Sequence, residues 1–245
     1  MSAPSRFAPP TGRPLGRTVA CLVLGFAVIC AGVVALGWAI THPLEDTMRH
    51  ENPVNRWFVD QRTSGLTHVA DAGSLVGETV TGLVVLVLLG VVFAVWRRTW
   101  WPLVFVGVLD AGMGLFYLAG TSLDPRPRPP VPILQSGLVA DASFPSGHTG
   151  TATAIAAALA ALLWAYTRVA KALLVLLLVV PAYTMVSRLY LGAHHVSDVV
   201  TAFVYAWLWA LLCARMLLPA RRAPVALPTS EAGSPPRIET RREDA

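Results

Sequence analysis

The sequence predicts an all-α membrane protein, a six-transmembrane helical bundle with both termini in the cytoplasm. Of its 245 residues, 55% are hydrophobic and 13% are charged, and a typical soluble domain has about 25% charged residues. A membrane-spanning helix needs about 20 mostly apolar residues. Six stretches meet this requirement, at residues 18–40, 77–96, 100–122, 148–167, 172–190 and 197–218.

These spans divide the chain into three parts. We expect a disordered cytoplasmic N-terminus at 1–17, a membrane domain at 18–218 and a disordered cytoplasmic tail at 219–245, because both ends are rich in Pro and Arg without hydrophobic periodicity. The first span resembles a secretory signal, since Arg13 and Arg17 precede it. Its apolar core is longer than the roughly 7–15 residues of such signals, which predicts a retained helix.

The loop between the first two spans, 41–76, contains Val54, Trp57 and Phe58 at helical spacing. Two interpretations fit this pattern equally well. The loop forms an amphipathic helix that lies on the membrane, or the two aromatic rings pack over the outer ends of the bundle.

The positive charges predict how the bundle is oriented. If the chain starts in the cytoplasm, 13 of its 19 Lys and Arg residues lie inside, including both short turns, 97–98 and 168–171. Cytoplasmic loops carry such an excess of Lys and Arg, so we expect both termini inside. The basic residues form no stripe beside stacking aromatics, which argues against a nucleic-acid partner.

Three polar clusters border the spans, at residues 124–130, 144–148 and 187–198. The first two share one loop, and the third joins the last two spans. Counting membrane crossings places all three on the same side, which is the outside in the predicted orientation. The three cysteines lie inside predicted spans, and their spacing indicates neither a metal site nor a disulfide framework; they are Cys21, Cys30 and Cys213.

The second cluster predicts a helix start, with Ser146 as its N-cap, Gly147 at the bend and His148 in the first turn. Free N–H groups and the positive end of the helix dipole make such a start a site for anions. In the third cluster, His194 and Asp198 are four residues apart and share a helical face, so the carboxylate can fix the imidazole tautomer.

Arginines complete the pattern, since guanidinium groups bind phosphate in a bidentate manner. The candidates are Arg126, Arg128 and Arg188. Each feature alone has an ordinary structural explanation, such as a stiff loop or a simple cap. Their combination indicates phosphoryl transfer.

At these residues the chain resembles the type-2 phosphatidic acid phosphatase superfamily of lipid phosphate phosphatases. The motifs of that family are Lys-x6-Arg-Pro, Pro-Ser-Gly-His and Ser-Arg-x5-His-x3-Asp, and the last two are matched in full by residues 145–148 and 187–198. The resemblance implies a helical-bundle core, metal-independent hydrolysis without a cofactor, and a phosphohistidine intermediate.

The resemblance also implies roles for individual residues. His194 is expected to be the nucleophile, Asp198 the carboxylate that orients it, and His148 the general acid. The residues expected to bind the phosphoryl group are Arg128, Arg188, Ser146 and Gly147.

One position departs from the family pattern, because Thr121 stands where the first motif has Lys. We expect Arg126 to compensate, since it lies two residues from Arg128 in an extended stretch. His195 points about 100° away from its neighbour on a helix, so it is not expected in the relay. Asp110 lies within a span and is either a functional group or a contact between helices.

These expectations describe a multi-pass phosphatase of a bacterial plasma membrane, with its active site outside and a lipid phosphate as substrate. A polyprenyl phosphate or diphosphate is favoured, with phosphatidylglycerol phosphate and phosphatidic acid as alternatives. A lipid phosphotransferase on the same scaffold and a non-catalytic lipid-phosphate carrier remain open. A haloperoxidase is disfavoured, because six long apolar spans suit a lipid substrate. The sequence does not indicate an oligomeric state.

Overall fold

The computed structural model describes residues 11–220, apart from the side chain of Leu173. This part of the chain is helical and contains no β-strand, only an isolated bridge between Arg126 and Ala142. The α-helices are α1 Leu15–Thr41, α2 Glu45–Met48, α3 Asn52–Asp60, α4 Ser64–Val76, α5 Thr79–Arg97, α6 Trp101–Leu123, α7 Gly147–Tyr166, α8 Lys171–Val175, α9 Val179–Tyr190 and α10 Val196–Leu217. Two 3-10 helices, η1 Arg49–Glu51 and η2 Leu176–Leu178, join neighbouring helices.

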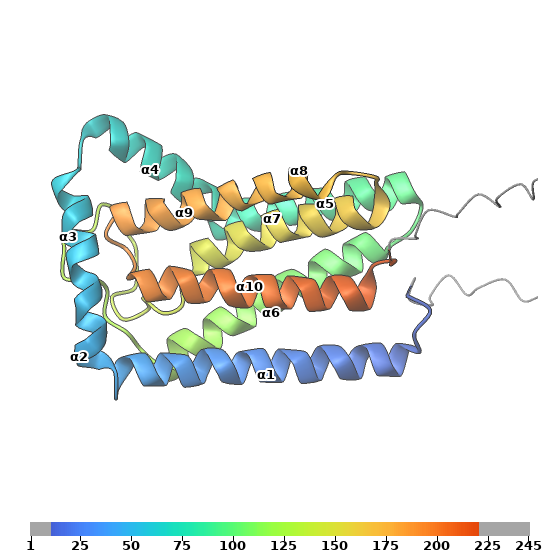
Figure 1. Ribbon diagram of the computed structural model, residues 1–245, viewed down its shortest axis with the longest axis horizontal. Helices are drawn as coiled ribbons and strands as arrows, with labels where there is room; N and C mark the ends of the chain where they lie inside the picture. Colours follow the sequence, from blue (N-terminus) through green and yellow to red (C-terminus); the bar gives the residue numbers. More distant parts are fainter. Residues whose placement is uncertain (1–10, 221–245) are drawn as a thin grey trace, which may run out of the picture.

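The long helices run alongside one another, while α2, α3 and α4 lie across one end of the bundle (Figure 1). The start of α1 and the end of α10 lie at the opposite end. Five helices, α1, α5, α6, α7 and α10, are long and apolar enough to cross a membrane. The all-helical, multi-pass class predicted from the sequence is therefore confirmed.

The sixth predicted span is built differently from a single helix. Residues 171–190 form α8, η2 and α9 in direct succession, and only a shorter apolar helix, Leu176–Tyr190, is continuous. Pro181 lies in the first turn of α9, where it cannot donate the N–H bond to the carbonyl four residues earlier. This explains the local change to 3-10 geometry. The segment still returns the chain along the bundle (Figure 1), and a sixth crossing stays a prediction.

Aromatic rings and glycines hold α1, α6 and α10 together. Phe26 stacks on Phe116 with ring centroids 4.7 Å apart, and Phe116 meets the edge of Trp209 at 5.7 Å. A side chain at Gly112 would collide with the Trp209 indole, so glycine permits the close approach of α6 and α10. Asp110 is half-buried, and both roles expected for it stay predictions.

The loop 41–76 bears out the packing interpretation for one of its two aromatic rings, and contact of the loop with the membrane stays a prediction. On α3, Phe58 packs toward Tyr190 with ring centroids 6.4 Å apart, whereas Trp57 is 57% exposed. Asn55, on the same helix, is fully buried. The inner face of α3 therefore covers the end of the bundle and its outer face carries an apolar side chain.

The tails expected to be disordered fall mainly on residues 1–10 and 221–245, which lie outside the described residues. Where the chain is described, α1 begins at Leu15, three residues before the predicted boundary.

Candidate active site

The three polar clusters meet at the end of the bundle that α2–α4 cover. Arg128 donates to the Ala193 carbonyl at 2.6 Å, which joins the first cluster to the third. The Ser146 N–H donates to the Asp198 carbonyl at 3.2 Å, which joins the second to the third. Helix starts at α7 and α10 and the end of α9 therefore converge on one site.

His194 lies in the turn between α9 and α10 and is 3% exposed. Its Nδ1 is 2.7 Å from the carbonyl oxygen of Ser143. A carbonyl oxygen only accepts, so Nδ1 carries the hydrogen, and in a neutral ring Nε2 keeps its lone pair. Asn55 donates to the His194 carbonyl at 3.0 Å and so holds the backbone of this turn.

The environment of His194 favours the neutral ring. Burial lowers the pKa of His194 to about 4; the nearby Asp198 carboxylate opposes this shift, and the positive charges of Arg188 and Arg128 add to it. A neutral imidazole with a free Nε2 lone pair is the form in which histidine attacks as a nucleophile.

Asp198 contacts His194 less directly than the spacing predicts. Its Oδ2 lies 3.7 Å from Nδ1 of His194, beyond hydrogen-bond distance. This oxygen instead accepts from Ser143 Oγ at 2.6 Å and from the His195 N–H at 2.8 Å. Asp198 therefore holds Ser143, and the Ser143 carbonyl fixes the tautomer of His194. The carboxylate caps the first turn of α10 at the same time.

Arg188, near the end of α9, is fully buried. Its Nη1 donates to Ser74 Oγ at 2.6 Å and to the side-chain oxygen of Gln135. Its Nε and Nη2 have no partner among the described residues. These two nitrogens carry three N–H groups, and leaving such donors buried and unpaired is unfavourable. The arrangement suits an anion that accepts from one edge of the guanidinium.

Arg128 approaches the site from the Pro-rich loop. Its Nε, Nη1 and Nη2 donate to the carbonyls of Val139, Ala193 and Ala142 at 2.9, 2.6 and 3.1 Å. Burial lowers the pKa of Arg128, yet the group stays charged at any relevant pH. One N–H on each terminal nitrogen is left over.

His148 is the second residue of α7 and is half-buried. It interacts electrostatically with Arg188, His194 and Arg128. Gly77, between α4 and α5, makes room for it, since a Cβ there would lie 2.9 Å from the Cβ of His148. The side chains of His148, Arg188, His194 and Arg128 therefore lie close enough to influence one another's charge.

Ser146 is the N-cap of α7, as predicted, and its Oγ accepts from the Thr149 N–H at 3.4 Å. The hydroxyl also donates to Thr149 Oγ1 at 3.1 Å. Its N–H and hydroxyl donors are used within the fold, and the expectation that Ser146 binds phosphate stays a prediction. The first N–H groups of the helix, on Gly147 and His148, have no acceptor within the helix and suit an anion.

The comparisons with known proteins identify a family and a similar fold. Residues 101–222 match the PAP2 superfamily. The chain belongs to this superfamily. Its fold is similar to a solved transmembrane PAP2-type phosphatidylglycerolphosphate phosphatase from Bacillus subtilis, with a TM-score of 0.63, 23% identity, and coverage of 81% of this chain and 94% of that one. No curated protein sequence gives a significant match.

Arg126, expected to compensate for the missing lysine of the PAP2 pattern, contacts acidic side chains of the protein in this structure. Its Nη1 donates to Asp198 and, at 2.7 Å, to Ser197 Oγ, and its Nη2 lies 3.4 Å from Glu51. Two carboxylates neutralise this guanidinium, which is 6% exposed. In this structure Arg126 therefore forms a buried ion pair, and its expected contact with phosphate stays a prediction. The Thr121 hydroxyl donates to the carbonyls of Tyr117 and Leu118 on its own helix, at 2.9 and 3.4 Å.

His195 occupies the N-cap of α10. Its Nε2 is 3.3 Å from the Pro127 carbonyl, and burial lowers the pKa of the ring. The ring is thus bonded to the Pro-rich loop. In the described residues no group of three or more His, Cys, Asp or Glu is arranged to hold a metal.

Several residues of this PAP2 site were missed by sequence reasoning. Glu51 accepts from the Ser197 N–H at 2.6 Å and from Ser197 Oγ at 2.8 Å. Together with Asn55 it forms an i, i+4 polar pair beside the apolar Phe58, a signal for a polar helix face turned toward the protein. Ser74, Gln135 and Ser143 had no such signal, because each comes from a different loop or helix.

Proposed function

We propose that this PAP2 protein is a membrane-bound phosphatase that hydrolyses a phosphomonoester or diphosphate of a lipid through a phosphohistidine on His194. The observation that carries the proposal is the buried Arg188, which has unpaired Nε and Nη2 and whose positive charge helps to keep the nearby His194 neutral. An anion with several oxygens satisfies those donors, and a nearby imidazole lone pair can attack it.

In the first step, phosphoryl oxygens accept from Arg188, from the spare N–H groups of Arg128 and from the start of α7. Nε2 of His194 forms a bond to phosphorus as the bond from phosphorus to the leaving oxygen breaks. His148 gives its proton to that oxygen. The developing charge on the equatorial oxygens is stabilised by the two guanidinium groups.

In the second step, water attacks the phosphohistidine. His148, now neutral, accepts the water proton, the phosphorus–nitrogen bond breaks, and phosphate leaves. Asp198 and Ser143 hold the His194 ring in one tautomer through both steps. All groups in this sequence are side chains or backbone N–H groups of this chain, so the proposed reaction uses neither metal nor cofactor.

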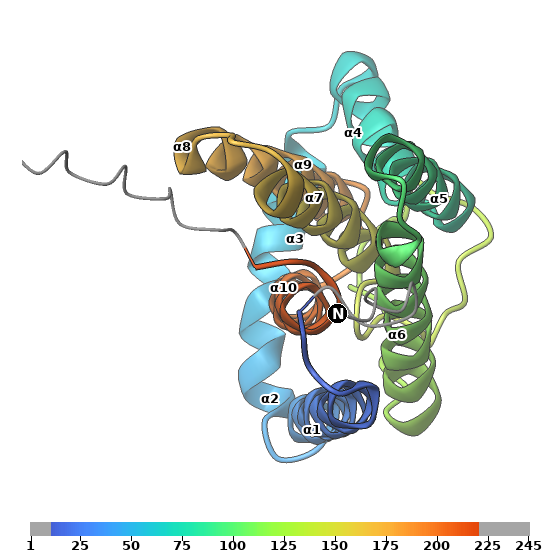
Figure 2. The same ribbon diagram turned by 90° about the vertical axis from the view of Figure 1, so that its right-hand side faces the viewer.

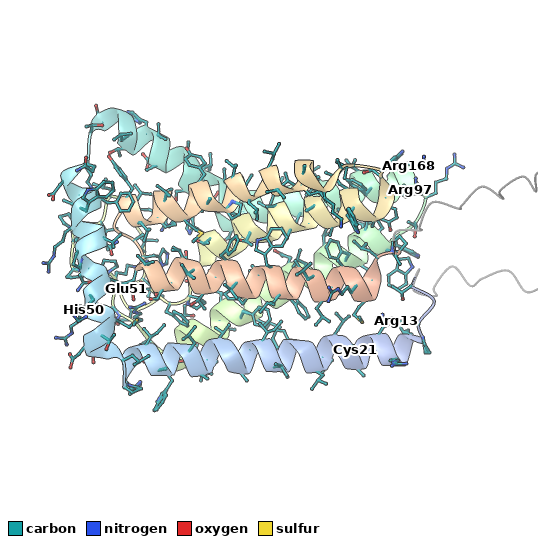
Figure 3. The ribbon with its side chains drawn as sticks, viewed as in Figure 1. Arg13, Cys21, His50, Glu51, Arg97 and Arg168 are labelled. Atoms are coloured by element: carbon teal, nitrogen blue, oxygen red, sulfur yellow. The ribbon has the colours of Figure 1, made fainter. Side chains whose placement is uncertain are left out.

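The proposed location is the outer face of a bacterial plasma membrane, with six spans and cytoplasmic termini. Arg13, Arg97 and Arg168 lie at one end of the bundle, and Glu51 beside the site lies at the other (Figure 3). The positive-inside rule places the basic end in the cytoplasm. A site at the outer end meets lipid head groups of that leaflet.

We propose a polyprenyl phosphate or diphosphate as the favoured substrate. Phosphatidylglycerol phosphate is the first alternative, and the similar Bacillus subtilis structure is of a phosphatidylglycerolphosphate phosphatase. Phosphatidic acid is the second.

The test is phosphate release by detergent-purified protein from a panel of these lipids with EDTA present. We expect His194→Gln to lower kcat by about 1,000-fold or more. The adjacent His195→Gln is the matched control, because it removes a second buried histidine, and it is expected to lose less than about 10-fold. Equal losses in the two variants, or activity that EDTA abolishes, would contradict the proposal. Release only when a lipid alcohol is added would indicate a phosphotransferase.

A further inference from the structure

An apolar groove lies at the end of the bundle opposite the active site. It has a volume of about 660 Å³ and is lined by the second half of α7, by α8 and by the end of α10. Its α7 wall consists largely of alanines, among them Ala157, Ala160 and Ala161. Viewed along the bundle, α8 stands away from α10 (Figure 2), and the short side chains of α7 leave the space between them open.

Three cations line this groove together with the apolar residues: Arg13, Lys171 and Arg215. Arg13 Nη1 lies 3.1 Å from the sulfur of Met216, and Lys171 Nζ lies 5.5 Å from the centre of the Trp164 ring. No Asp or Glu lines the groove, and none of the three cations forms an ion pair with the described residues. The groove therefore combines an apolar wall with positive charge that no acidic side chain of residues 11–220 neutralises.

We propose that this groove binds one anionic glycerophospholipid, with an acyl chain along the alanine face of α7 and the phosphate beside the three cations. Basic pockets between helices at a membrane surface bind anionic head groups in this way. The volume lies in the range of small-molecule sites, about 300–1,000 Å³. The inference requires only that the bundle lies in a bilayer and is independent of the proposed catalytic reaction.

Charge favours a lipid over protein segments as the occupant. The sequence continues from Ala220 with Arg221 and Arg222, which a cationic groove repels. A second copy that approached with its own basic end would meet the same repulsion. An anionic lipid supplies both the missing negative charge and the apolar surface.

Occupancy of the groove has a structural consequence. The α7 and α10 helices that line it carry His148 and Asp198 at their other ends, and α8 leads through η2 into α9, which carries Arg188. A bound lipid bridges these helices at the end where α8 stands apart. We expect it to raise the Tm of the whole bundle.

The experiment uses the full-length protein, delipidated in detergent and supplied with phosphatidylglycerol or with zwitterionic phosphatidylcholine of the same chains. Native mass spectrometry measures retained lipid, and a thermal unfolding scan measures Tm. We expect phosphatidylglycerol to be retained preferentially and to raise Tm by roughly 5 °C more than phosphatidylcholine does. In Lys171→Gln/Arg215→Gln we expect this preference to fall at least about five-fold.

The matched control is Arg98→Gln/Arg168→Gln, which removes the same charge from exposed positions that do not line the groove. It is expected to keep the preference. A second variant, Ala161→Phe, fills the groove and leaves the cations in place, and it is expected to lose retention of phosphatidylglycerol. Equal retention of both lipids by the wild type, or an equal loss in the control, would overturn the proposal and indicate another occupant or a general surface charge effect.

Discussion

Arg188 and Arg126 are both buried at the same end of the bundle, yet their partners are opposite in kind. Arg126 contacts two carboxylates, Asp198 and Glu51. Arg188 contacts two neutral side chains, and two of its nitrogens have no partner among the described residues. Removing one member of a buried ion pair destabilises the fold, whereas a buried charge without a partner is a candidate for binding an oppositely charged ligand. Burial alone therefore does not distinguish a structural arginine from a functional one.

The largest expected effect comes from Arg188→Gln. Loss of the bidentate contact to the transition state is expected to lower kcat/KM by about 1,000-fold or more. Tm is expected to stay the same or rise, because an incompletely paired charge leaves the interior. The assay compares lipid phosphate hydrolysis and thermal unfolding of the same preparation. A fall in Tm as large as that of an Arg126 variant would contradict the assignment of Arg188 as a functional rather than a structural charge.

For Arg126→Gln we expect the opposite result, a large loss of stability and a smaller loss of activity. Removing the cation leaves Asp198 and Glu51 without their buried partner, at a cost of about 3–5 kcal/mol. For a domain of this size that corresponds to a Tm lower by roughly 10 °C. Activity of the folded fraction is expected to fall only about 10–100-fold, through displacement of Asp198.

A double variant tests whether the loss of the buried ion pair is what lowers the Tm. Arg126→Gln/Glu51→Gln removes one of the two stranded carboxylates and is expected to recover part of the lost Tm. A double variant less stable than either single change would contradict the ion-pair explanation.

The pH dependence of stability provides a third test, centred on His194. Its pKa in the folded protein is about 4, below the ordinary value of 6.5, so between these values the unfolded chain binds the proton more readily. The contribution of His194 to the free energy of unfolding is therefore fully present above about pH 6.5. It falls by up to about 3 kcal/mol as the pH drops to 4. Thermal scans across this window should show a flatter profile for His194→Gln. An unchanged slope would argue against a neutral, buried His194.

The smallest expected effect is that of Ser143→Ala. The carbonyl that accepts from His194 remains, and only the hydroxyl contact to Asp198 is lost. We expect kcat to fall about 3–10-fold, the loss for one hydrogen bond of positioning, with little change in Tm. A loss as large as that of Asp198→Asn would mean that the hydroxyl, rather than the carbonyl, carries the orientation of the ring.

The fold and the site differ in how far sequence reasoning reached them. Five of the six predicted spans appear as long apolar helices within a few residues of their expected bounds, because hydrophobic length reports directly on the bilayer. The sixth was predicted as one helix, but Pro181 breaks its hydrogen-bond pattern. The end-cap formed by α2–α4 was predicted only as a loop with two interpretations, since its contacts are with distant parts of the chain.

The helical membrane class, the PAP2 motifs and the motif residues that meet at the site could be predicted from the sequence, because each depends on local spacing or hydrophobic length. The hydrogen-bond partners of those residues became clear only from the three-dimensional arrangement of the helices. It assigned Arg126 to Asp198 and Glu51, placed the Ser143 carbonyl between Asp198 and His194, and left Arg188 with open donors. The physical reason is that pairing of buried charge depends on groups brought together from separate helices, and residue spacing along the chain carries no record of those distances.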